Sequence, residues 1–154
     1  MNRREVLRIL DANFNRSREG LRVCEEIARF VMEDKALTRR LKNARHAVSD
    51  CLKGIPASWS ELVASRDVRR DVGKGRSALE NGRRNTLDLF LANSERAKES
   101  LRVLEEASKL MDEKISAKLK KTRFDVYAIE KSALPKMEAL CHHRPRRQQK
   151  KISD

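Results

Sequence analysis

The amino-acid sequence predicts an all-α protein in which two copies of a helical hairpin form a four-helix bundle with a loop-rich connector. Leucine and valine recur at helical spacing through most of the chain. With five Gly and three Pro in 154 residues, the chain has few of the residues that the many turns of an all-β protein need. The third observation is an internal repeat, because residues 12–26 return 80 positions later as residues 92–106. We expect the two hairpins to bury their apolar faces against each other.

The repeat covers most of each hairpin. Residues 12–33 and 92–113 are identical at 10 of 22 positions. After a shift of two residues the match resumes, and the paired residues are Leu41, Lys42, Arg45 and Val48 with Leu119, Lys120, Arg123 and Val126. Each copy therefore reads as a long helix followed by a shorter antiparallel one.

The repeat also sets the domain organisation. We expect one helical domain, residues 1–140, made of repeat one (about 3–53), a connector (54–76) and repeat two (about 77–133). Residues 141–154 hold five Lys or Arg against one acid, and we expect this basic tail to be disordered.

The elements of repeat one follow from apolar period and from helix-breaking residues. We expect a helix over about 3–32 and a second over about 36–53, with Gly54 and the proline two residues later breaking the chain. A Ser-x-x-Glu capping box at 58–61 predicts a short helix that ends at Ala64.

Repeat two begins after a stretch that reads as a loop, 65–76, which contains two glycines. A second capping box at 77–80 predicts a helix that continues to about Leu110. The last helix is expected over about 116–132, stopping before Pro135.

Composition restricts the location and the partners of the protein. The net charge is +13, and removing the +4 of residues 141–154 leaves +9 on the domain, so the domain itself is expected to meet an anion. No apolar run approaches the roughly 18 residues of a membrane span, and we expect no membrane partner. Three cysteines without a CxxC pair favour a reducing compartment, and we expect a cytoplasmic protein.

Both copies place polar residues within the apolar stripe of a helix. Asn13 and Arg16 in repeat one match Asn93 and Arg96 in repeat two. The partner helices interrupt their own stripes with Arg45 and Arg123. The four arginines and two asparagines are expected to converge on a positive pocket near the pseudo-twofold axis, where arginine forks would bind phosphate oxygens.

A structural alternative is open for these arginines. Glu19, Glu26, Glu99 and Glu106 border the same stripe and could pair with them as ion pairs that only hold the bundle together.

The connector carries a second cluster, which occurs once in the chain. Arg66, Asp67, Asp71 and Gly73 combine carboxylates, which suit Mg²⁺, with an arginine and a glycine turn, which suit phosphate. The alternative is a solvated basic loop.

Three segments resemble a known family. They are LDANFNRSREGLRVCEE at 10–26, RD at 66–67 with DVG at 71–73, and AN at 92–93 with Arg96 and LRVLEE at 101–106. In order and spacing they are similar to the signatures of the strictly monofunctional hydroxymethylpyrimidine phosphate kinases, whose helical domain is often fused in front of thiamine phosphate synthase. The resemblance covers about residues 7–131.

The resemblance implies ATP-dependent phosphorylation of hydroxymethylpyrimidine phosphate to the diphosphate in thiamine biosynthesis, with Mg²⁺. Under it, we expect the four arginines to grip phosphates and the two asparagines to orient the pyrimidine or a phosphate. Asp67 or Asp71 would hold Mg²⁺, and Arg66 would steady the transferred group.

Other functions are open at this stage. The chain could be a non-catalytic partner or scaffold of a separate thiamine phosphate synthase, or, less in keeping with its inward arginines, a helical module that binds nucleic acid. The sequence also leaves open whether a second copy completes the pocket, and whether duplication left one site or two.

Overall fold

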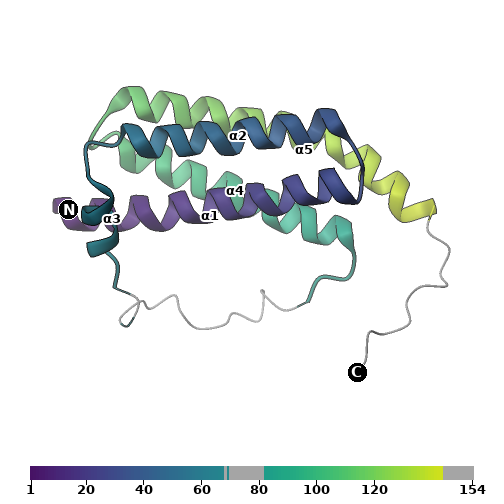
Figure 1. Ribbon diagram of the computed structural model, residues 1–154, viewed down its shortest axis with the longest axis horizontal. Coiled ribbons are helices and arrows are strands. Elements are labelled where there is room, and N and C mark those ends of the chain that lie inside the picture. The colour runs from purple at the N-terminus through teal and green to yellow at the C-terminus, as the bar shows by residue number, and fades with distance from the viewer. Residues whose placement is uncertain (68, 70–81, 144–154) are drawn as a thin grey trace.

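The computed structural model describes residues 1–67, 69 and 82–143, and this part of the chain is helical and contains no strand (Figure 1). The helices are α1 (Arg3–Phe30), α2 (Lys35–Gly54), α3 (Trp59–Ala64), α4 (Thr86–Ser108) and α5 (Glu113–His143). The predicted all-α class is confirmed. No helix in the described ranges is long and apolar enough to cross a membrane.

The contacts between the four long helices place them at the corners of a square. Helix α1 packs on α2 and α4, while α5 packs on α4 and α2, and no direct packing joins either diagonal pair within the described residues. The core lies between them, and matched positions of the two repeats are fully or almost fully buried in it. These pairs are Leu21 with Leu101, Leu41 with Leu119, and Val48 with Val126. The duplication in sequence is therefore a duplication of the core.

Local capping sets where three of the helices start. Asn2 caps α1, since its side chain accepts from the Glu5 backbone N–H and its own N–H donates to the Glu5 carboxylate. Asp34 caps α2 in a similar way by accepting from two backbone N–H groups. The predicted capping box of Ser58 and Glu61 is present at the start of α3.

Two predicted boundaries in repeat two are wrong. Helix α4 begins at Thr86 and is capped by Asn85. Residues 82–85 are not helical, so the expected continuous helix from position 77 to about Leu110 is not formed. The predicted capping box at 77–80 lies outside the described residues.

Helix α5 continues through Pro135 to His143 instead of stopping before the proline. Ala133 and Met137 on either side are 0% and 1% exposed, so burial of this turn outweighs the backbone hydrogen bond that proline cannot donate. The first three residues of the predicted tail therefore belong to α5, and residues 144–154 lie outside the described part.

Helices α1 and α4 approach each other closely at Gly20. A Cβ atom there would lie 2.7 Å from the carbonyl oxygen of Asn93 and 3.4 Å from the backbone nitrogen of Ala97. Backbone atoms cannot rotate away as a side chain can, so this crossing depends on the absence of a side chain at Gly20.

We expect Gly20→Ala to destabilise the fold by about 1–2 kcal/mol, because the helices must separate and this outweighs the better helix propensity of alanine. Urea unfolding monitored by far-UV circular dichroism measures the change. Ser100→Ala is the matched control, since Ser100 occupies the equivalent position and already carries a Cβ. Equal or greater stability of Gly20→Ala would contradict the close approach.

Candidate functional site

The four predicted arginines do not meet in one internal pocket. Arg45 pairs with Glu25, with 2.8 Å between Nε and Oε2, and Arg123 pairs with Glu105 through Nε at 3.0 Å and Nη2 at 2.8 Å. Both glutamates are buried, at 4% and 3% exposure. These two arginines form structural ion pairs, as the alternative expected, but with Glu25 and Glu105 and not with any of the four glutamates that it named. Each neutralises a carboxylate between the two helices of its own hairpin.

These ion pairs extend in the same way in both repeats. Arg22 also contacts Glu25 and pairs with Glu26, and in repeat two Arg102 contacts Glu105 and Glu106. Sequence reasoning considered the second glutamate of each doublet and missed the first. The available signal was the doublet itself, because two adjacent residues point about 100° apart on a helix and only one of them can face the partner helix.

Hydrogen bonding keeps the Arg123 pair charged. Burial alone would lower the pKa of the Arg123 guanidinium, but its hydrogen bonds, chiefly to Glu105, outweigh burial and raise the pKa. This guanidinium is therefore committed to Glu105 and is not available as a phosphate ligand in this arrangement.

Arg16 and Arg96 are exposed, so their predicted inward position is wrong. Arg16 lies one turn before Gly20 on α1. On α4, Arg96 lies in sequence between Asn93 and Ala97, the two residues that Gly20 approaches. Both arginines are therefore located beside the α1–α4 crossing. Their guanidinium groups make no hydrogen bond or ion pair to another residue that the structure describes. We call this the Arg16–Arg96 surface.

The two asparagines use their amide N–H groups within their own helices. Asn13, 7% exposed, donates to the Ile9 carbonyl at 2.8 Å, and Asn93 donates to the Leu89 carbonyl at 2.8 Å. No donor among the described residues is bonded to either amide oxygen.

Arg66, predicted to steady a transferred group, is held at the start of the connector by α1. Its Nε and Nη2 donate to the two carboxylate oxygens of Asp11 at 2.7 and 2.8 Å. These hydrogen bonds raise the pKa of the Arg66 guanidinium above its usual range. Asp11 is 5% exposed and was missed by sequence reasoning, although it sits in the first signature directly after a core leucine.

Asp67, a predicted Mg²⁺ ligand, is half-buried, and its backbone carbonyl accepts from Arg8 Nη2 at 3.4 Å. The other predicted connector residues, Asp71 and Gly73, lie outside the described residues. Among the residues that are described, no three His, Cys, Asp or Glu side chains gather as a metal site. The Mg²⁺ expectation thus depends on Asp67, whose carboxylate suits the ion, and on groups beyond the described part.

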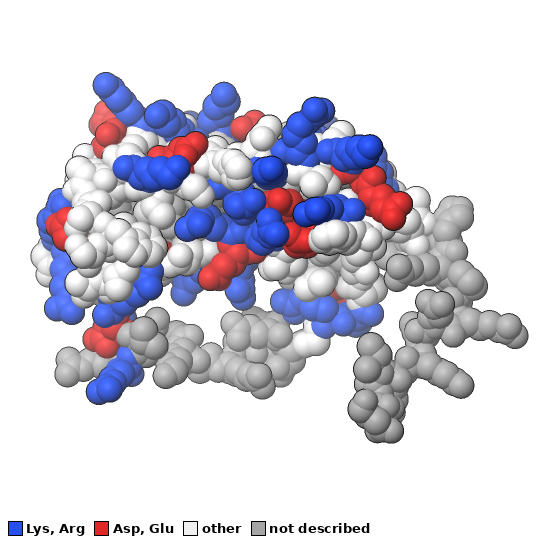
Figure 2. Space-filling model, viewed as in Figure 1, with Lys and Arg blue, Asp and Glu red and all other residues white. Residues whose placement is uncertain are grey.

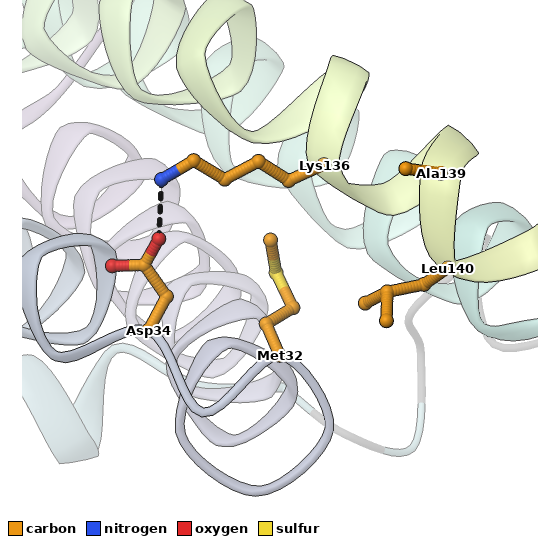
Figure 3. A pocket seen from close by; sticks show the side chains of 5 residues that line it. All are labelled: Met32, Asp34, Lys136, Ala139 and Leu140. Atoms are coloured by element: carbon orange, nitrogen blue, oxygen red, sulfur yellow. Dashed lines mark hydrogen bonds and ion pairs between the residues drawn. The ribbon is translucent and has the colours of Figure 1, made fainter.

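A pocket of about 330 Å³ opens between the α1–α2 turn and the end of α5 (Figure 3). Met32 and Leu140 point into it, and an ion pair between Asp34 and Lys136 closes one side. The hydrogen bond from Lys136 lowers the pKa of Asp34. With a mostly apolar lining and its one lysine already paired, this pocket offers little to a phosphate.

A second pocket, of about 400 Å³, lies at the opposite end of the bundle, between the start of α1 and α3 (Figure 1). It is lined by Arg3, Arg4, Leu7, Glu61, Ala64 and Ser65. It adjoins the start of the connector, because its last lining residue directly precedes Arg66.

The positive charge does not form a continuous strip on the face that Figure 2 shows. Basic side chains over α1 and α2 are interspersed with acidic ones on this face (Figure 2). Such mixing agrees with local ion pairs such as Arg22 with Glu26. It differs from the uninterrupted basic stripe that tracks a nucleic-acid backbone.

We expect Glu105→Gln to lower the free energy of unfolding by about 2 kcal/mol, because a buried guanidinium loses its charged acceptor. Chemical denaturation measures this loss. Glu106→Gln, whose side chain is 47% exposed, is the control and should change stability by less than about 0.5 kcal/mol. Equal effects of the two substitutions would show that the buried pair is not what holds α4 to α5.

Comparison with known proteins finds a family match and several relatives. A thiamine-phosphate synthase of Rhodopirellula baltica is 40% identical over 140 residues, which is 89% of this chain and 36% of the relative. A thiamine-phosphate synthase of Synechocystis is 42% identical over 130 residues, 84% of this chain and again 36% of the relative. The chain thus spans about a third of the length of these relatives, and no solved structure matches it. The ThiD2 family model matches residues 8–132, and the chain belongs to the ThiD2 family.

Proposed function

We propose that the protein is an ATP-dependent kinase that converts hydroxymethylpyrimidine phosphate to the diphosphate in thiamine biosynthesis. The pathway is supported by relatives named thiamine-phosphate synthase and by the family of the chain. The observation that carries the kinase is the Arg16–Arg96 surface. Of the four duplicated arginines, two are neutralised by buried glutamates, while these two are exposed and without a partner in the described part of the chain.

Phosphoryl transfer mainly needs groups that hold phosphates in place and neutralise their charge. Arg16 and Arg96 would bind phosphate oxygens, with the amide oxygens of Asn13 and Asn93 beside them to orient an amino-substituted ring. Arg66 would contact the transferred group. Asp67, together with Asp71 beyond the described residues, would hold Mg²⁺, which when bound supplies further neutralisation of phosphate charge.

A coupled ADP-release assay with Mg-ATP tests this function directly. We expect turnover with the pyrimidine monophosphate and none with the unphosphorylated pyrimidine, because the arginines require a phosphate on the acceptor. No turnover on either compound, with a helical far-UV spectrum, would refute the kinase.

We expect Arg16→Ala and Arg96→Ala each to lower kcat/KM by roughly 10- to 100-fold, since each removes hydrogen bonds to a charged group worth about 1.5–3 kcal/mol. The far-UV spectrum should not change, because both side chains are exposed. Arg39→Ala on α2 is the matched control, as Arg39 is also exposed, and should retain normal turnover. Wild-type kinetics in both test variants would remove the Arg16–Arg96 surface from the site.

A second candidate function has its own support, because the relatives of the chain are named thiamine-phosphate synthase and neither of the two cited is named a kinase. The chain could act as a non-catalytic partner of a thiamine phosphate synthase. This function predicts a stable complex with such a synthase, detected by analytical ultracentrifugation, and no ATP turnover by the chain alone or in the complex.

A further inference from the structure

The two repeats stop being equivalent at one point. Gly54, the last residue of α2, matches Ser132 in the middle of α5. Repeat one then turns into α3 and the connector, whereas repeat two continues as the same helix. On the long helices, Asp11 matches Leu91. At this matched position, the buried carboxylate is present in repeat one, the repeat whose end turns toward the connector.

Asp11 holds the Arg66 guanidinium by one edge, and no other described residue binds the opposite edge. The Asp11 carboxylate occupies Nε and Nη2 of Arg66, and no hydrogen bond joins Nη1 to another described residue. The Trp59 ring lies under the same guanidinium, with 5.7 Å from Cζ to the ring centroid. The Arg66 side chain is still 37% exposed. Its guanidinium is therefore fixed on one edge and one face, and its remaining N–H groups are not bound by any other residue that the structure describes.

Packing alone does not account for Asp11. Burying a carboxylate costs free energy that a single ion pair only partly restores, and an apolar residue of similar size serves as well or better in a core. Repeat two shows this alternative at the same position, where Leu91 packs against the core. The charge at Asp11 is therefore better explained by what it does to Arg66.

We propose that Asp11, with Trp59, positions Arg66 as a phosphate ligand, so that the molecule has a single phosphate-transfer end, on the side of repeat one. This inference rests on the proposed kinase function and deepens it. The pocket of about 400 Å³ between α1 and α3 supports it, because Ser65 of that pocket precedes Arg66 and Leu7 lies one turn before Asp11. Arg3 and Arg4 add positive charge to the same pocket. Asp11 is a positioning residue in this scheme, and Arg66 is the residue that touches the phosphate.

Trp59 provides a direct readout of this arrangement, since it is the one tryptophan of the chain and is 58% exposed. In Asp11→Asn, we expect the Trp59 emission spectrum and its quenching by acrylamide to change, because Arg66 leaves the ring. Glu105→Gln is the matched control: it removes the negative charge from a buried arginine pair in repeat two, in which Arg123 donates through Nε and Nη2, and its Trp59 signal should equal that of the wild type.

Kinetics separate positioning from stability. At a temperature where both variants are folded, Asp11→Asn should lower kcat by about 100-fold with KM for the pyrimidine monophosphate within about threefold. Glu105→Gln should leave both parameters within about twofold of the wild type. Arg66→Lys keeps the charge but loses the fork, so it should lose as much as Asp11→Asn, and the double variant should lose no more than either.

Equal kcat losses in Asp11→Asn and Glu105→Gln, or a normal kcat in Asp11→Asn, would overturn the inference. If the wild type shows no turnover, the kinase proposal fails by itself, and calorimetric titration with Mg-ATP then tests the inference. Binding weakened at least fivefold by Asp11→Asn and not by Glu105→Gln would sustain it. Equal binding by the variants, or no binding by the wild type, would overturn it.

Discussion

The close crossing of α1 and α4 determines where the other parts of this molecule can lie. Gly20 lets the backbones meet at a distance that a single methyl group would prevent. The first long helix of each repeat is thereby held against its counterpart, and the bundle is completed by α2, which packs on α1, and α5, which packs on α4 and on α2. The same crossing brings Arg16 and Arg96 to one surface, since each lies within about one turn of the contact. Helix packing and the candidate phosphate surface thus follow from the same missing side chain.

Buried charged side chains are neutralised by ion pairs within each helical hairpin. Two buried ion pairs cross between helices, Glu25 with Arg45 and Glu105 with Arg123. Each glutamate also contacts an arginine of its own helix, Arg22 or Arg102. A buried carboxylate must be paired, so each pair fixes the rotation of one helix against the other. This use of arginine explains why a sequence with a net charge of +13 folds around an apolar core instead of a wholly cationic one.

The two repeats differ in their buried and partly buried charged residues. Asp11 and Arg66 have no counterpart pair in repeat two, where Leu91 and the continuing α5 take their place. Repeat two has its own unique buried cation, Lys98, which is paired with Glu95 and Glu130. Its two carboxylates leave that lysine little capacity for a ligand, whereas Arg66 pairs with a single carboxylate among the described residues. The duplication therefore built a symmetric frame, and later divergence made the two ends chemically different.

Sequence alone determined the features that depend on neighbours along the chain. The helical class, the duplication, the family resemblance and the capping box of α3 were all readable, because period, identity and capping act over a few residues. The buried course of α5 through Pro135 was not, since a local rule stops a helix there and only packing of Met137 in the core overrides it. The sequence also did not show which glutamate of the doublet, Glu25 or Glu26, faces the partner helix. Nor did it show that Arg45 points inward while Arg16 is exposed. Those choices depend on how each helix is rotated toward its partner, and that rotation is set by the tertiary structure.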